Sequence, residues 1–236
     1  MAEWQRILSI PFKRTEKPTM NYLPVEGIRL LLEGPDQSTR NGRRDLALLS
    51  LMYDSGARVQ EIIDLTPSMV RLDPPYTVKL IGKGNKTRIV PLLEQQVKFL
   101  RIYMTERKLL EPYANTYPLF SNSRREKLTR AGVNYILAKY TNQARGKAPS
   151  LFPEKISCHC MRHSKAMHLL QSGVNLVYIR DILGHSSVQV TEIYARADSH
   201  QKREAIEKAY SEVSPKEVSP WLNNDDLLSW LKSFNQ

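Results

Sequence analysis

Hydrophobic residues recur at helical spacing along most of the chain. In segment 45–53, Leu46, Leu49 and Met52 are three residues apart and share one face of a predicted helix. The same pattern, bounded by glycine and proline breakers, predicts further helices. Their ranges are 23–32, 59–65, 94–109, 129–140, 160–171, 176–183 and 188 to about 210. We expect a basic, polar loop over 143–152, between two of these helices.

One stretch instead follows the two-residue period of a strand. Residues 76–81 alternate and are rich in β-branched and aromatic side chains, and residues 86–90 resume the pattern after a Gly-Lys-Gly-Asn turn. The pattern predicts a hairpin with Lys83 and Lys86 at or beside its tip. The predicted fold class is therefore mainly α with a small antiparallel β-sheet (α+β).

The two ends of the chain differ from this globular middle. Segment 1–21 is basic and contains two prolines, which fits an extended arm or linker remnant as well as a partly ordered terminus. Residues 22–210 form the predicted main domain. Segment 211–220 repeats Glu-Val-Ser-Pro and is interpreted as a tether. In 221–236, apolar residues at i, i+3, i+4 and i+7 predict a short amphipathic helix.

Composition narrows the class of partner. The 236 residues include 35 Lys plus Arg against 24 Asp plus Glu, a net charge of +11, which favours a polyanionic partner such as nucleic acid. A hydrophobic content of 41% excludes wholesale disorder. No apolar run approaches the roughly 20 residues of a membrane span, and no export signal is visible. With two cysteines separated by one residue, a reduced, cytoplasmic protein is the simpler interpretation.

The segment around residue 160 carries the first candidate site. His159 and Arg162 are three residues apart on a helix that Ser157 could cap, so both could face an oxyanion near the helix N-terminus. Polar residues scattered on a solvent-facing helix are the alternative. Metal binding through Cys158 and Cys160 is disfavoured because adjacent residues do not readily converge on one ion. We therefore expect no metal site in this segment.

Each of the other candidate site residues, taken alone, is weak evidence for a function. Tyr194 is a poor nucleophile unless a base and cations assist it, because a phenol has a pKa of about 10. His185 could be an ordinary turn residue, and Lys83 a solvated one. Arg58 could enter a cleft with Glu61 orienting a neighbour, or the two could form a surface ion pair worth under about 1 kcal/mol.

The order and spacing of these residues are more specific than any one of them. Arg58, Lys83, the His159-x-x-Arg162 pair, Gly-His185 and Tyr194 nine residues later resemble the tyrosine recombinase (phage integrase) family. Intervening stretches at 53–61, 88–92 and 168–174 extend the resemblance over about residues 45–205. The resemblance implies that 22–210 is a catalytic domain of this fold and that the chain is a site-specific recombinase or integrase of DNA.

The resemblance also implies a mechanism that uses no metal, no ATP and no other cofactor. Tyr194 would attack a DNA phosphate to give a 3′-phosphotyrosine link and a free 5′-hydroxyl. Arg58 and Arg162 would hold the non-bridging oxygens, a contribution on the order of 3 kcal/mol each. Lys83 would act as the general acid, with Lys86 as its rival, and His159 would assist proton transfer from the phenol. His185 would hydrogen-bond the phosphate, while Glu61 would orient a neighbour.

DNA contacts are expected mainly with the backbone. The candidates are basic residues of a loop, of the helix that follows it and of the hairpin: Lys86, Arg124, Arg125, Lys127 and Arg130. A solvated basic face is an equal alternative for the loop and helix. The resemblance further implies a homo-oligomer, a tetramer on two paired DNA sites, with DNA-bending accessory proteins as possible partners. The C-terminal helix would dock on its own domain or on a neighbouring protomer.

The chain also departs from the family pattern. Only 57 residues precede Arg58, too few for the DNA-clamping domain that family members usually carry, so we expect a catalytic fragment or a short form. The alternatives in function are a non-cleaving DNA-binding protein on this scaffold and an enzyme resembling a type IB topoisomerase or telomere resolvase. The sequence leaves open the target DNA and whether integration, excision or dimer resolution is the task.

Overall fold

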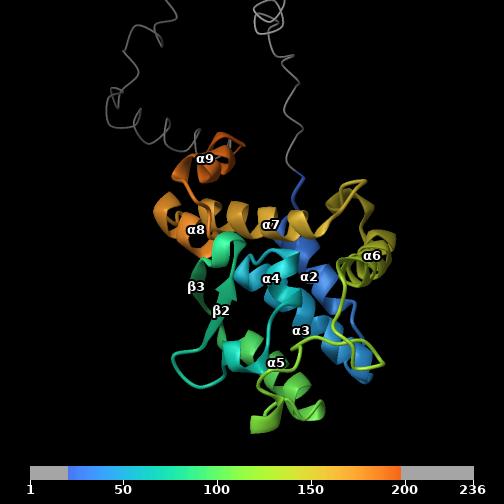
Figure 1. Cartoon of the computed structure of the whole chain (residues 1–236). Helices are drawn as coiled ribbons and strands as arrows, with labels where there is room; N and C mark the ends of the chain where they lie inside the picture. The colour runs from blue at the N-terminus through green and yellow to red at the C-terminus, as the bar shows by residue number, and fades with distance from the viewer. Residues whose placement is uncertain (1–20, 198–236) are drawn as a thin grey trace, which may run out of the picture. The chain divides into compact units, whose positions relative to one another are not determined.

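The computed structural model describes residues 21–197. The basic arm (apart from Asn21), the tether, the C-terminal helix and the end of the last predicted main-domain helix lie outside the described residues. The described elements are mostly helical, as Figure 1 shows. The α-helices are α2 (Val25–Glu33), α3 (Arg40–Ser55), α4 (Val59–Ile63), α5 (Glu94–Glu106), α6 (Arg130–Lys147), α7 (Cys158–Gln171), α8 (Leu176–Leu183) and α9 (Val188–Ala197). Short 3-10 turns occur at Pro67–Met69, Lys83–Asn85, Pro112–Ala114 and Pro149–Leu151.

A small antiparallel sheet accompanies the helices. Its strands β1 (Val70–Arg71), β2 (Thr77–Ile81) and β3 (Thr87–Pro91) follow one another in the order β1-β2-β3. The predicted hairpin is confirmed, with Val78 opposite Val90 and Leu80 opposite Arg88. The two-residue β1 was missed because it is too short to show an alternating pattern. The α+β class is thus confirmed.

Helix α3 runs through the main core. Its residues Leu48, Leu49 and Leu51 are fully buried, and it packs against α5 and α7. A second apolar cluster joins α7, α8 and α9 and contains Met167, Leu183 and Tyr194. Tyr194, the candidate nucleophile, is thus buried among α7, which carries His159 and Arg162, and the two helices that flank His185.

Three predicted helix boundaries were wrong for identifiable reasons. Helix α3 begins at Arg40, five residues earlier than expected, because the Thr39 side chain accepts a hydrogen bond from the Gly42 N–H (3.0 Å) and caps the first turn. Helix α5 ends at Glu106 because Lys108 adopts a left-handed conformation with φ 57°. Helix α6 continues to Lys147, so residues 143–147 are helical rather than part of a loop, because Ala144 keeps facing the core.

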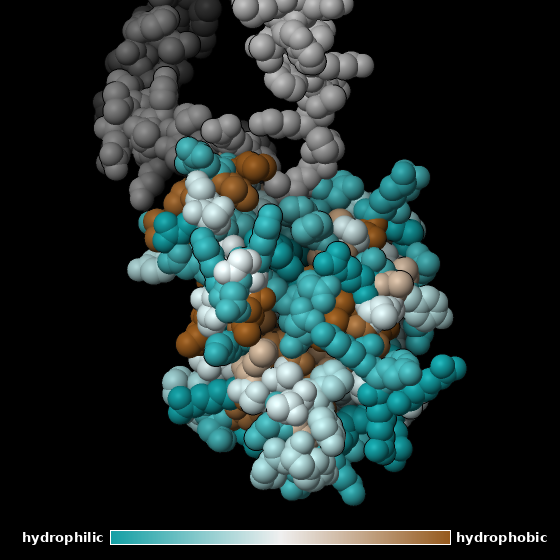
Figure 2. Space-filling model, in the orientation of Figure 1, coloured by the Kyte–Doolittle hydropathy of each residue, from teal (hydrophilic) through white to brown (hydrophobic). Residues whose placement is uncertain are grey.

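The surface is mostly hydrophilic. Figure 2 shows charged and polar side chains over most of the visible face, with hydrophobic residues confined to small patches. Within residues 21–197 no helix combines the length and apolar character needed to cross a bilayer.

Candidate active site

Glu61 organises the cationic side of the candidate site. It is only 4% exposed and begins helix α4 by accepting the Arg58 N–H at 2.7 Å. Its carboxylate also accepts a hydrogen bond from Arg58 Nη1 at 3.0 Å. Burial opposes ionisation, but the hydrogen bonds from Arg88 and the Arg58 N–H, with both guanidinium charges, hold the pKa of Glu61 below its usual value. Glu61 therefore remains a carboxylate that orients Arg58.

Arg88 is a second partner of Glu61 that the sequence analysis missed. Its Nη1 and Nη2 donate to the two carboxylate oxygens at 2.8 and 2.7 Å, and its Nε donates to the Ile182 carbonyl at 2.9 Å. Strand β3, helix α4 and the end of α8 are thus joined through one side chain. A signal was present, because Arg88 lies two residues from buried Val90 and so faces the protein interior.

The turn after α8 is fitted closely around Arg88. Gly184 ends the helix with φ 65°, and a Cβ at this position would lie 2.9 Å from the Arg88 side chain. The Gly184 carbonyl also accepts from Arg58 Nη2 at 3.3 Å. Because Gly184 has no Cβ, the turn just before His185 can contact both Arg88 and Arg58.

Arg162 is the most buried of the candidate cations, at 3% exposure. Its two terminal nitrogens donate to the Gly56 carbonyl at 2.7 Å and the Leu183 carbonyl at 2.6 Å. Burial, together with the positive charges of Arg58 and Arg88, lowers the pKa of Arg162 to about 10. The side chain is still charged at neutral pH and is fixed between the ends of α3 and α8.

Tyr194 lies in this cationic region and is 3% exposed. Its hydroxyl is 3.0 Å from His163 Nδ1. Burial raises the pKa of the phenol, and the charges of Arg162 and Arg58 oppose this rise. The pKa of His163 is lowered by burial and by the nearby His159 and Arg162, which keeps its imidazole neutral and able to accept a proton.

The expected partner of the phenol, His159, lies farther out. Its side chain is exposed, and its ring centroid is 5.8 Å from that of His163. The contact with Tyr194 is made by His163, the residue directly after Arg162. The sequence contained this histidine, but helical spacing directed attention to residues three apart and not to the neighbour of Arg162.

His185 lies on the other side of Tyr194. The two rings are nearly parallel, with centroids 6.1 Å apart. His185 Nδ1 is 3.0 Å from the hydroxyl of buried Thr191. Burial and the charges of Arg162, Arg58, Arg88 and His163 lower the pKa of His185 to about 4. The imidazole is therefore neutral at pH 7, with its second ring nitrogen available to a ligand.

The hairpin approaches the same region through its first turn residue. A Cβ on Gly82 would lie 3.0 Å from Glu61 Oε1 and 3.7 Å from Arg58 Nη1. Lys83 and Lys86, next to this contact, are exposed. Among the described residues, no hydrogen bond joins either ammonium to Tyr194, and no ion pair joins it to Glu61.

The predicted DNA-contact residues of the basic loop and of helix α6 do not all lie together. Lys127 pairs with Asp64, and Arg130 Nε donates to Gln60 Oε1 at 2.8 Å, so both lie against helix α4. Arg125 instead lines a pocket at the end of α5. Arg124 is exposed in the intervening loop.

The cysteines do not form a metal centre with their neighbours. Cys158 Sγ is 3.0 Å from Asn134 Oδ1, and burial raises the pKa of this thiol to about 11. A protonated thiol is a poor metal ligand. Among residues 21–197, no three His, Cys, Asp or Glu side chains are grouped so as to hold an ion.

The arrangement has the chemistry of an oxyanion site with a nucleophile. Arg58 and Arg88 share one carboxylate, Glu61, and Arg162 adds a third positive charge held by backbone carbonyls, so the region keeps an excess of positive charge. A neutral imidazole contacts the phenol and a second one lies beside it. Such a site can bind a phosphodiester and support proton transfer from the attacking group.

Comparison with known proteins identifies the family. The model of the Phage integrase family matches residues 21–201. A putative integrase/recombinase, y4rC, from Sinorhizobium fredii is 36% identical over 233 residues, covering 99% of this chain and 68% of the relative. The tyrosine recombinase XerD of Staphylococcus epidermidis is 35% identical over 202 residues, covering 85% of this chain and 65% of XerD.

Solved structures agree with these relatives. The XerH site-specific recombinase, in a post-cleavage complex with a palindromic difH substrate, superposes with a TM-score of 0.69 at 27% identity, over 84% of this chain and 57% of XerH. The chain thus spans about two thirds of the length of the curated relatives named above, and somewhat less of XerH. With the fold and the family match in agreement, the chain belongs to the phage integrase family, the tyrosine recombinases.

Proposed function

We propose that this chain cuts and rejoins DNA in site-specific recombination, with Tyr194 as the nucleophile. The phenol oxygen attacks the scissile phosphorus while the bond from phosphorus to the 5′ oxygen breaks. The phenol proton passes to a base, and the leaving 5′ oxygen receives a proton from an acid. The resulting 3′-phosphotyrosine keeps the ester bond, so a 5′-hydroxyl can reverse the step without ATP.

The observation that carries this proposal is the 3.0 Å distance between the Tyr194 hydroxyl and His163 Nδ1 inside a cationic region. A neutral imidazole at this distance can take the phenol proton as the nucleophile attacks. In this proposal His163 is the direct base. The role predicted for His159 then becomes contact with the phosphate or with His163, whose ring it faces.

The other residues have roles that follow from their chemistry. Arg162 and Arg58 stabilise charge on the non-bridging oxygens, and neutral His185 donates from its free ring nitrogen. Lys83 is the proposed acid for the 5′ oxygen, because Gly82 brings the turn beside Arg58. Lys86 is the rival acid. Neither a metal nor a nucleotide cofactor has a step in this scheme, since the guanidiniums supply the positive charge.

The proposal extends to partners and setting. Double-stranded DNA with specific sites is the proposed substrate, bound by a homotetramer on two paired sites. Lys127 and Arg130 are proposed DNA-backbone contacts beside α4, together with Arg124 of the preceding loop. Support comes from the XerH complex with its difH substrate and from the bacterial relatives. On this basis the protein would act in the cytoplasm.

The proposal can be tested with a library of nicked DNA duplexes that carry a randomised centre. The nick lets the short strand that carries the freed 5′-hydroxyl diffuse away, so a covalent adduct accumulates. Wild-type protein should yield DNA adducts that survive denaturing detergent, and Tyr194→Phe should yield none while still binding the library. Equal adduct from both proteins, or no adduct from wild type on DNA that it binds, would contradict the proposal.

A further inference from the structure

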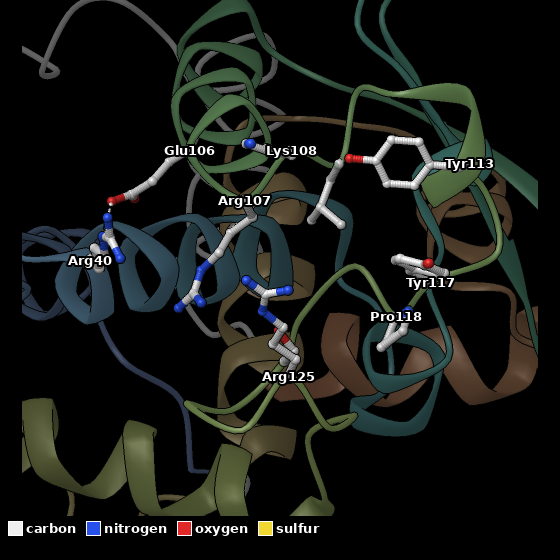
Figure 3. A pocket seen from close by; sticks show the side chains of 10 residues that line it. Arg40, Glu106, Arg107, Lys108, Tyr113, Tyr117, Pro118 and Arg125 are labelled. Carbon is white, nitrogen blue, oxygen red and sulfur yellow. Dashed lines mark ion pairs between the residues drawn. The ribbon is translucent and has the colours of Figure 1, made fainter.

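A second cationic region lies at the C-terminal end of α5, toward the end of the domain away from α8 and α9 (Figure 1). It is a pocket of about 480 Å³ and shares no lining residue with the candidate active site. Figure 3 shows its side chains. Those that matter here are Glu106, Arg107, Lys108, Tyr113, Tyr117 and Arg125.

The acidic side chain among the lining residues, Glu106, pairs with arginines of α3 and not with Arg107 or Arg125. Glu106 is already engaged, because Arg43 donates to both of its oxygens at 3.0 and 2.6 Å and Arg40 lies 3.3 Å away. Among the described residues, Arg107, Lys108 and Arg125 have no ion pair. Figure 3 shows the guanidinium groups of Arg107 and Arg125 converging on the same space from different segments. Convergent guanidiniums without a carboxylate favour an anionic ligand.

Arg107 gives a second, independent indication. Its Nε is buried and has no hydrogen-bond acceptor in the part of the chain that the structure describes. A buried N–H without a partner is costly, and a ligand oxygen would satisfy it once the Arg107 side chain turns this N–H toward the pocket. The opposite wall is ordered by local hydrogen bonds, since Asn122 Oδ1 accepts the N–H groups of Arg124 (2.9 Å) and Glu126 (3.0 Å) on either side of Arg125.

Two tyrosines also line the pocket. Tyr113 and Tyr117 are 61% and 51% exposed, with ring centroids 6.2 Å apart at an angle of 63°. In Figure 3 they lie to one side of the two guanidiniums. Exposed aromatic faces next to cations are the combination that proteins use to bind unstacked nucleotides, with bases on rings and phosphates on arginines.

We propose that this pocket binds a nucleoside phosphate unit, with the phosphate on Arg107 and Arg125 and the base on Tyr113 or Tyr117. The volume falls in the range of small-molecule sites. The unit could be a free nucleotide or an unpaired nucleotide within a DNA strand, which share this chemistry. The proposal does not depend on the cleavage function, since it uses neither Tyr194 nor its neighbours.

Isothermal titration calorimetry of the full chain tests the charge contribution. The probes are hexathymidylate, an abasic hexamer of the same length and thymidine 5′-monophosphate. Arg125→Met should weaken hexathymidylate binding about tenfold, as expected for losing one charge-assisted contact. It should also reduce the salt dependence by about 0.7 log units per log unit of salt. Arg29→Met removes an exposed arginine on α2 and should leave both values unchanged.

Aromatic variants test the base contact. Wild type should prefer hexathymidylate over the abasic hexamer, Tyr117→Leu should reduce that preference, and Tyr117→Phe should keep it because the ring and not the hydroxyl stacks. A hexamer that binds more tightly than the monophosphate would identify a strand as the ligand, and equal affinity a free nucleotide. Equal binding by Arg125→Met and Arg29→Met, or no preference over the abasic hexamer, would overturn the proposal.

Discussion

The two cationic regions of this protein hold their arginines in different ways. In the candidate active site, Arg162 is fixed by two backbone carbonyls, and Arg58 and Arg88 by Glu61. In the pocket at the end of α5, Arg107 and Arg125 form no ion pair among the described residues, and Arg107 leaves a buried N–H unsatisfied. The arginines of the first region are held in position before any ligand binds. Those of the second region are not held by an acidic side chain among the described residues.

This difference has a physical consequence. A preorganised site needs little rearrangement when charge develops on a phosphate, which is what catalysis requires. Its arginines also stabilise the fold, so their loss should reduce both rate and stability. Arginines of the open pocket should affect ligand binding with little effect on stability. The predictions below test that contrast.

The largest effect is expected for Arg162→Lys. Lysine keeps the positive charge but cannot donate to the Gly56 and Leu183 carbonyls and to a phosphate together. We expect adduct formation on the nicked duplex library to slow by about 10²-fold or more, measured in a single turnover. DNA affinity should change much less. A rate within a fewfold of wild type would show that Arg162 does not contact the reacting phosphate.

Arg88→Met should have the next largest effect, through positioning. The substitution leaves the buried Glu61 carboxylate without its bidentate partner, so we expect the free energy of unfolding to fall by about 3 kcal/mol. Denaturant unfolding measures this loss. Adding Glu61→Gln removes the unpaired charge and should recover much of the stability. In the folded protein, Arg88→Met should lower the single-turnover cleavage rate while leaving DNA affinity intact.

The contrast between the two cationic regions can be tested by comparing the free energies of unfolding of Arg125→Met and Arg88→Met. Arg125→Met should leave the free energy of unfolding within about 0.5 kcal/mol of wild type, because Arg125 has no ion pair among the described residues to lose. If Arg125→Met and Arg88→Met destabilise the protein equally, the contrast between the regions is wrong.

A smaller effect is expected from acid. The pKa of His185 is lowered to about 4 from the ordinary 6.5, because burial and three arginines disfavour the charged imidazole. The unfolded chain therefore binds more protons between these values, so stability is full above pH 6.5 and falls as the pH drops toward 4. Urea unfolding from pH 7.5 to 4.5 should show this slope, and His185→Asn should reduce it. An unchanged slope in His185→Asn would mean that His185 is not held neutral.

The smallest effect is expected at the C-terminal end of helix α4. Lys127→Met removes one proposed backbone contact and its exposed ion pair with Asp64. The salt dependence of duplex binding should decrease by about 0.9 log units per log unit of salt, with little change in stability. A titration at several salt concentrations measures the slope. If the slope equals that of wild type, Lys127 is not a phosphate contact.

Much of the fold could be predicted from local pattern. The hairpin was predictable because Val78, Leu80 and Val90 alternate with exposed residues, and α8 because glycines bound its short apolar run. Helix α6 was predicted to end too early, because its last turns are polar except for Ala144. Composition indicated a loop there, whereas one small buried residue per turn was enough to continue the helix.

The candidate site was less predictable in its contacts than in its residue types. Spacing indicated Arg58, Glu61, Arg162 and Tyr194, but the bond from Arg88 to Glu61 joins segments 27 residues apart. Similarly, the contact between His163 and Tyr194 spans 31 residues. Pairings of this kind depend on how helices and strands pack, which no local pattern encodes.

The central claim is that Tyr194 takes over a DNA phosphate within this cationic site. The most direct test is to digest the covalent adduct and locate the nucleotide-bearing peptide by mass spectrometry. The account predicts a nucleotide attached at Tyr194 through its 3′ phosphate. Attachment at another tyrosine, or through a 5′ phosphate, would contradict it.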